Sequence, residues 1–79
     1  MEFKPKDIVR HFKGNMYEII CIASHTETGE KMMVYKSRDD YEKIWVRPLE
    51  MFLSDVDHEK YPDVKREKRF ELVSRVWKD

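Results

Sequence analysis

Residues 10–53 have the sequence RHFKGNMYEIICIASHTETGEKMMVYKSRDDYEKIWVRPLEMFL. Stretches rich in β-branched and aromatic residues alternate with polar turns in this segment, as is typical of short antiparallel strands. Gly14 and Gly29 mark two of the turns, and glycine readily adopts the positive φ angles that tight hairpin turns require. The segment therefore predicts a mainly β protein built from hairpins.

The pattern predicts four strands followed by a helical turn. Residues 16–25 are apolar on both faces near their centre, which is typical of a strand inside a sheet. Pro48 has no backbone N–H, so we expect it to end the fourth strand and to begin a single helical turn over residues 48–53. The predicted strands are residues 7–12, 16–25, 31–37 and 44–47.

The last third of the chain allows two predictions. Residues 54–63 form a polar excursion loop, and residues 69–73 can form a fifth strand with Phe70 and Leu72 directed inward. Apolar residues near helical spacing over residues 64–77 also permit a helix. We favour the strand, because an antiparallel sheet needs a closing partner at its edge.

Strands, one helical turn and a final strand follow one another in the order seen in SH3-like barrels. We therefore expect residues 1–79 to form one domain, a small SH3-like antiparallel barrel of about five strands with one helical turn after Pro48. Within its central hairpin we expect residues 27–29 to be a three-residue loop, which pairs Ile22 with Val34. Cys21 lies in an apolar run and is expected to be a small buried residue.

Four motifs in the same order resemble those of a bacterial family known as domain of unknown function 1653. The resemblance covers about residues 7–53 and has a weaker echo at residues 60–62 and 69–70. It implies a compact stand-alone domain of bacterial origin and brings no established activity. The chain departs from the family pattern at residues 37–43, where many members have a Gly-bearing loop and this chain has SRDDYEK. The motifs that carry the resemblance are KGNMYEI, SHTETGE, MVYK and WVRPLEMF.

Composition restricts the partners and the compartment. The 16 Lys and Arg balance the 16 Asp and Glu, but residues 60–79 are locally basic. No apolar run approaches the ~20 residues that span a bilayer, and the N-terminus lacks the apolar segment of a signal peptide. A single cysteine fits a reducing compartment. We expect a cytoplasmic protein without a membrane partner.

The sequence offers no arrangement typical of an enzyme or a metal site. Ser24 and His25 are neighbours on a strand, so their side chains should point to opposite faces and cannot form a nucleophile–base pair. The histidines and the cysteine lack metal-ligand spacing. The acidic residues 55–59 lack the glycine of a calcium-binding loop. We therefore expect a non-enzymatic protein without a cofactor or a metal.

Binding is the function that the strand pattern favours. Trp45 and Arg47 should share the face opposite Ile44 and Val46, and an aromatic ring beside an arginine can hold a peptide. The same Trp45 can instead be half of a two-sided core. Although the function is unknown, we expect a binding or accessory module for a protein or peptide partner. Its expected contact residues are Tyr17, His25, Tyr35, Trp45 and Arg47.

The alternative partner is RNA or single-stranded DNA, bound through the same face and a basic run near the C-terminus. This run consists of Lys65, Arg66, Lys68 and Arg69. Because Glu67 interrupts it, the run also fits a charged edge strand that resists aggregation. A small enzyme is a minor alternative. Charges on the first and last strands favour a monomer or a weak dimer.

Overall fold

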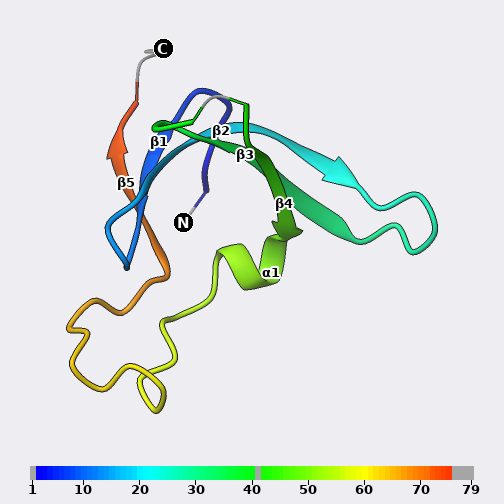
Figure 1. The fold of residues 1–79 in the computed structure, drawn as a ribbon. Helices are drawn as coiled ribbons and strands as arrows, with labels where there is room; N and C mark the ends of the chain where they lie inside the picture. Colours follow the sequence, from blue (N-terminus) through cyan, green and yellow to red (C-terminus); the bar gives the residue numbers. More distant parts are fainter. Residues whose placement is uncertain (1, 41, 76–79) are drawn as a thin grey trace.

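The computed structural model describes residues 2–40 and 42–75, which form one five-stranded antiparallel sheet and one short helix. The strands lie in the order β4-β3-β2-β1-β5, so β2 is inside the sheet as predicted, and β4 and β5 form its edges. The sheet is strongly curled (Figure 1). In the part of the chain that the structure describes, β4 and β5 are not paired with each other, so the barrel does not close. The elements are β1 (Ile8–His11), β2 (Met16–Ser24), β3 (Lys31–Ser37), β4 (Ile44–Pro48), α1 (Leu49–Phe52) and β5 (Phe70–Ser74).

These elements confirm the predicted mainly β fold and the helical turn after Pro48. Pro48 is the last residue of β4 and also the N-cap of α1. The final segment is a strand rather than a helix, and β5 pairs with β1 along its length. Residues 76–79, which the alternative helix included, lie outside the described residues.

The predicted register of the central hairpin is wrong. The backbone N–H of His25 donates to the carbonyl of Glu30 at 2.8 Å, so the loop contains four residues, 26–29, rather than three. Ile22 consequently pairs with Met33 instead of Val34. Gly29 does occupy the expected positive-φ position, with φ of 75°.

The same shift corrects the prediction for Cys21. The four-residue loop places Cys21 opposite Val34, and a bulge between Ile19 and Cys21 puts Cys21 on the face opposite to that of the buried Ile19. Cys21 is therefore exposed. The bulge and the longer loop could not be inferred from periodicity, because both keep the apolar composition of the strand unchanged.

The core lies on the concave face of the curled sheet and is dominated by aromatic rings. Phe52 of α1 stacks on Phe70 of β5 with centroids 3.9 Å apart and planes 10° apart. Tyr35 of β3 meets both rings edge-on, at 5.2 and 5.7 Å. The helix is thus fixed over the concave face by the same rings that attach β5 (Figure 1). The buried core cluster comprises Phe3, Val9, Ile19, Met33, Tyr35, Phe52 and Phe70.

A buried ion pair fixes the N-terminal segment against the end of β5. The Asp7 carboxylate is fully buried and accepts hydrogen bonds from Nε and Nη2 of Arg75, at 2.9 and 2.8 Å. The backbone N–H of Lys4 donates a third bond to it at 2.8 Å. These bonds, above all those from Arg75, lower the pKa of Asp7 below its ordinary value.

No helix among the described residues is long and apolar enough to span a membrane.

We predict that Arg75→Met lowers the free energy of unfolding at pH 7 by about 2–3 kcal/mol. The variant leaves a buried carboxylate without its charged partner, and Arg75 is one-third exposed, which reduces the loss below that of a fully buried pair. Because the folded state lowers the pKa of Asp7, its contribution is complete above pH 3.8 and is lost as the pH falls through the folded pKa. Urea denaturation at several pH values measures both effects.

The matched control is Arg66→Met, which breaks an ion pair with Glu71 and should cost less than about 1 kcal/mol, because the Glu71 side chain is 46% exposed whereas Asp7 is buried. Equal losses in the two variants would show that the Asp7–Arg75 pair has no special role in stability.

Candidate functional site: a basic pocket

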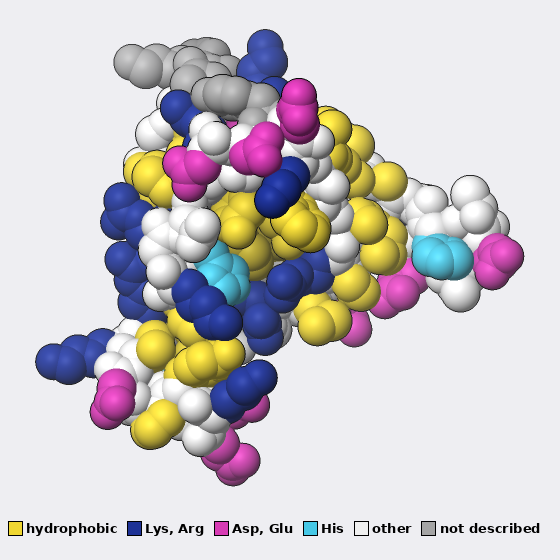
Figure 2. All heavy atoms as spheres, viewed as in Figure 1, with side chains coloured by type: hydrophobic (Ala, Val, Ile, Leu, Met, Phe, Trp, Pro, Cys, Tyr) yellow, Lys and Arg dark blue, Asp and Glu magenta, His cyan; other side chains and the backbone are white. Residues whose placement is uncertain are grey.

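A cavity of about 270 Å³ opens where the turn after β1, the strand β4 and the long connection between α1 and β5 meet. Figure 2 shows Lys and Arg side chains gathered around a hollow in the middle of this face, beside a histidine. We call this cavity the basic pocket. It is lined by four cationic residues (Lys13, Arg47, Lys60 and Arg69), two rings (Phe12 and Tyr61), His11 and Asp57.

The long connection between α1 and β5 is held in place by its own backbone pairing. The N–H of Val56 donates to the carbonyl of Glu67 at 2.7 Å, and the N–H of Arg69 donates to the carbonyl of Ser54 at 3.0 Å. Val56 is buried, which anchors the connection against the rest of the protein. These contacts fix the two ends of a loop whose tip carries Asp57, Lys60 and Tyr61 to the pocket.

At the tip of this loop, Asp57 shapes the backbone. Its Oδ1 accepts hydrogen bonds from the N–H groups of Glu59 and Lys60, at 3.1 and 3.3 Å. The N–H of Tyr61 donates to the Asp57 carbonyl at 2.9 Å. The turn that results presents Lys60 and Tyr61 to the cavity. Asp57 is thus a structural residue of the loop as well as the only carboxylate that lines the pocket among the described residues.

Two aromatic contacts join the loop tip to the turn after β1. Phe12 and Tyr61 meet edge to face with centroids 5.0 Å apart. The Nζ of Lys13 lies 5.2 Å from the centre of the Tyr61 ring, and the Nζ of Lys60 lies 5.5 Å from it. The hydrogen bond and charge of Lys13, together with the charge of Lys60, lower the pKa of Tyr61.

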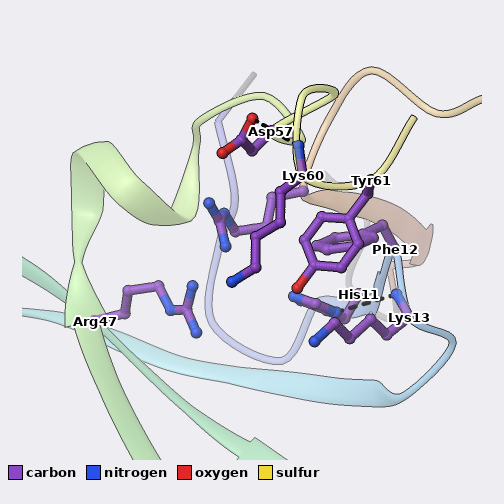
Figure 3. A pocket seen from close by; sticks show the side chains of 8 residues that line it. His11, Phe12, Lys13, Arg47, Asp57, Lys60 and Tyr61 are labelled. Atoms are coloured by element: carbon purple, nitrogen blue, oxygen red, sulfur yellow. Dashed lines mark hydrogen bonds between the residues drawn. The ribbon is translucent and has the colours of Figure 1, made fainter. Parts of the chain in front are cut away.

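Arg47 and Arg69 enter the pocket from opposite edges of the sheet. Arg47 lies on the core-side face of β4, and its Cζ is 5.9 Å from the centre of the Phe70 ring. Arg69 precedes β5, and its Nε donates to Oγ of Ser54 at 3.2 Å. In Figure 3 the Arg47 guanidinium and the Lys60 ammonium point toward the same space from different sides. Two guanidinium groups therefore line the pocket, one from each of the two edges of the sheet that do not pair with each other.

None of the four cationic residues forms an ion pair with a carboxylate among the described residues. Five other basic residues do form such pairs in the same part of the chain: Lys36, Lys43, Arg66, Lys68 and Arg75. Bringing four like charges together without partners is electrostatically unfavourable, so the arrangement suits an added anion.

Burial and the positive charge of the pocket both lower the pKa of His11. Burial, and then the charges of Arg47, Arg69 and Lys13, lower the pKa of His11 from 6.5 to about 4. Its Nδ1 accepts a hydrogen bond from the backbone N–H of Lys13 at 3.1 Å. The neutral ring therefore carries its proton on Nε2, so at neutral pH His11 can offer that N–H as an uncharged donor.

The structure distributes the expected contact residues over several places. Tyr17 and Tyr35 meet edge-on at 5.2 Å in the core, where Tyr35 is buried and unavailable to a ligand. His25 lies directly before the loop of the β2–β3 hairpin, where its Nδ1 accepts backbone N–H bonds from residues 27 and 28. Trp45 is 48% exposed and pairs with Tyr35 on the core-side face, so the structure does not bury it as a core residue. Of this set only Arg47 lines the basic pocket.

The basic run near the C-terminus is divided in a similar way. Lys68 pairs with Asp55 at 2.9 Å and Arg66 pairs with Glu71 at 3.5 Å, while Lys65 is exposed. Arg69 alone belongs to the pocket.

The remaining pocket residues were not singled out from the sequence for this role. His11, Phe12 and Lys13 precede the Gly14 turn, and Asp57, Lys60 and Tyr61 lie in the predicted excursion loop. The alternation of basic and aromatic residues in both segments was the available signal. No periodicity shows that the two segments meet. No group of three or more metal-ligating side chains occurs among residues 2–40 and 42–75.

The chain belongs to the family described as protein of unknown function DUF1653, whose sequence model matches residues 7–72. This match includes every residue of the basic pocket. No curated protein and no solved structure matches the chain.

We predict that Arg47→Met raises the pKa of His11. After burial, the charge of Arg47 is the largest cause of the lowered pKa, so removal of this charge should move the pKa from about 4 toward 6.5 without reaching it. NMR titration of the His11 ring measures the pKa directly. Lys43→Met, which removes a charge from the polar loop before β4, should leave it unchanged. The same value in both variants would place the Arg47 charge away from His11.

Proposed function

We propose that this chain is a non-enzymatic binding module of the bacterial cytoplasm that engages an anionic group of its partner in the basic pocket. The observation that carries the proposal is the convergence of four cationic side chains that have no carboxylate partner among the described residues. Cations at separate places on a surface are ordinary, whereas these come from three segments far apart in the sequence. Such convergence is typical of sites that bind a compact anion.

The arrangement supports binding rather than catalysis. The pocket holds one neutral histidine, one carboxylate and four cations, and Asp57 uses its Oδ1 to hold the loop backbone. A nucleophile next to a base, or a pair of carboxylates, would support a catalytic role. The described pocket residues include neither arrangement.

The structure supports a compact anion over a long nucleic-acid strand. A strand-binding surface needs a track of cations along the backbone and open ring faces for the bases. Here Arg66 and Lys68 are ion-paired outside the pocket. The Tyr61 ring is already covered by Lys13, Lys60 and the edge contact with Phe12.

We predict that sulfate, added at constant ionic strength, shifts the amide resonances of residues 11–13, 47, 57–61 and 69. Replacing Arg47 or Lys60 by Met should weaken sulfate binding by about 5- to 30-fold each, since one charge-assisted bond contributes about 1–2 kcal/mol. Lys65→Met is the matched control: it removes the same charge from an exposed site outside the pocket. Equal weakening by Lys65→Met would indicate a nonspecific field effect, and unmoved pocket resonances would refute the proposal.

A second candidate function is contact with a protein partner along β4. The observation that favours it is an edge strand that exposes three consecutive apolar side chains, Ile44, Trp45 and Val46, at 60%, 48% and 59%. An exposed apolar edge can pair with an extended segment of another chain.

We predict that Trp45→Ala leaves sulfate binding unchanged and abolishes any partner contact along β4. Trp45 does not line the basic pocket, so the two activities should separate. Sulfate titrations of the variant and of the unaltered protein, followed by amide NMR, check this independence. A loss of sulfate affinity in a Trp45→Ala protein with an intact amide spectrum would contradict it.

A further inference from the structure

The side chains of the basic pocket restrict its ligand by the geometry of their donors as well as by their positive charge. Arg47 and Arg69 contribute two guanidinium groups from opposite edges of the sheet, and a guanidinium can donate two parallel N–H bonds to one oxyanion. Lys13 and Lys60 add two ammonium groups near the Tyr61 ring. With one carboxylate in the lining, the pocket is charged well beyond what a single carboxylate ligand would neutralise.

His11 adds a donor without adding charge. Its Nδ1 is occupied by the N–H of Lys13, so the neutral ring can donate only from Nε2. The ring is held in place by Phe12 at 4.4 Å and by Phe70 at 4.9 Å. An oxyanion with several acceptor oxygens can use this donor together with the two guanidinium forks.

The rings of the pocket do not offer a stacking surface. Phe12 meets Tyr61 edge to face, and the ammonium groups of Lys13 and Lys60 lie near the Tyr61 ring. In Figure 3 Phe12, Lys13 and Tyr61 lie together at one side of the cavity, whereas Lys60 extends toward Arg47. The lining therefore suits contact with an anionic group better than stacking against a base.

We propose that the basic pocket recognises the dianionic phosphoryl group of a phosphomonoester, a proposal that rests on the anion-binding function above. The phosphoryl group supplies two charges and three strong acceptor oxygens. Four cations and a neutral N–H donor match this demand better than that of a carboxylate or of a phosphodiester, each of which has one charge. The phosphomonoester can be a small metabolite or a phosphorylated side chain of a protein.

The charge of the ligand makes this proposal testable by pH. A phosphomonoester loses its second proton near pH 6, so about a tenth is dianionic at pH 5 and nearly all at pH 7.5. The groups that face His11 are Lys13 from the turn, Arg47 from β4 and Arg69 before β5. The loop tip adds Asp57, Lys60 and Tyr61 to the same pocket. His11 is neutral through most of this pH window, so the change in affinity should follow the ligand.

The experiment compares three probes by amide NMR at constant ionic strength, at pH 5 and pH 7.5. They are N-acetyl-O-phosphoserine amide, N-acetylglutamate amide and inorganic sulfate, which is dianionic at both pH values. We expect phosphoserine to bind about tenfold more tightly at pH 7.5 than at pH 5, sulfate to change little, and glutamate to bind at least tenfold more weakly than phosphoserine at pH 7.5. The bound dianion should also raise the pKa of His11, because it offsets the surrounding cations.

Two variants test the geometry. Arg47→Lys keeps the charge and removes the fork, so it should weaken phosphoserine binding by about 3- to 10-fold. Lys65→Met should leave it unchanged, and the amide spectrum of each variant verifies folding. A longer phosphoserine peptide and glycerol 1-phosphate then distinguish the source: tighter binding of the peptide indicates a protein partner, and equal binding indicates a small metabolite.

The possible failures are distinguishable. If glutamate binds as tightly as phosphoserine and neither depends on pH, the phosphomonoester is refuted while anion binding stands. If no probe moves the pocket resonances, both proposals fail. If Arg47→Lys and Lys65→Met weaken binding equally, the anion is held by the general field of the surface, which also refutes both.

Discussion

The ring of Phe70 lies at the centre of the aromatic contacts that join the sheet to the helix. Its ring stacks on Phe52 at 3.9 Å and meets Tyr17, Tyr35 and His11 edge-on at 4.9–6.0 Å. One side chain thus attaches β5 to the helix, to β3 and to β1. Loss of a buried ring of this size typically costs about 3–5 kcal/mol, a large share of the stability that a 79-residue domain possesses.

The basic pocket is built directly on this ring. Arg47 lies over Phe70, His11 packs against its edge, and Arg69 is the residue before it. The apolar cluster therefore supplies the rigidity that four unpaired cations require, since their mutual repulsion opposes the folded arrangement. Five other basic residues of the described chain do pair with carboxylates, for example Lys68 with Asp55. Because the four cations of the basic pocket lie close together, their electrostatic cost is concentrated where a ligand can relieve it.

The sequence predicted most of the fold because the decisive signals were local. Strand length, the two glycine turns and Pro48 each act over a few residues, and the fifth strand followed from the need to complete the sheet. The prediction of the hairpin register was wrong because the TETG sequence is compatible with both a three-residue and a four-residue loop. The bulge after Ile19 then changed the face on which Cys21 lies, and no composition rule reveals such a bulge.

The candidate site was only partly predictable, for a different reason. Strand alternation correctly placed Arg47 with Trp45 on one face, but it could not show that this face curls inward and meets a loop from residues 54–69. Lys60 and Tyr61 reach the pocket because Asp57 closes a local turn and because Val56 is buried and pairs with Glu67. The turn is local, but the position of the loop depends on the pairing of its two ends, which no local pattern reveals. The residues with a chemical role are thus set by where the loop returns to the sheet. In a small open barrel, the last gap in the sheet is the place where such a loop can add a site without disturbing the core.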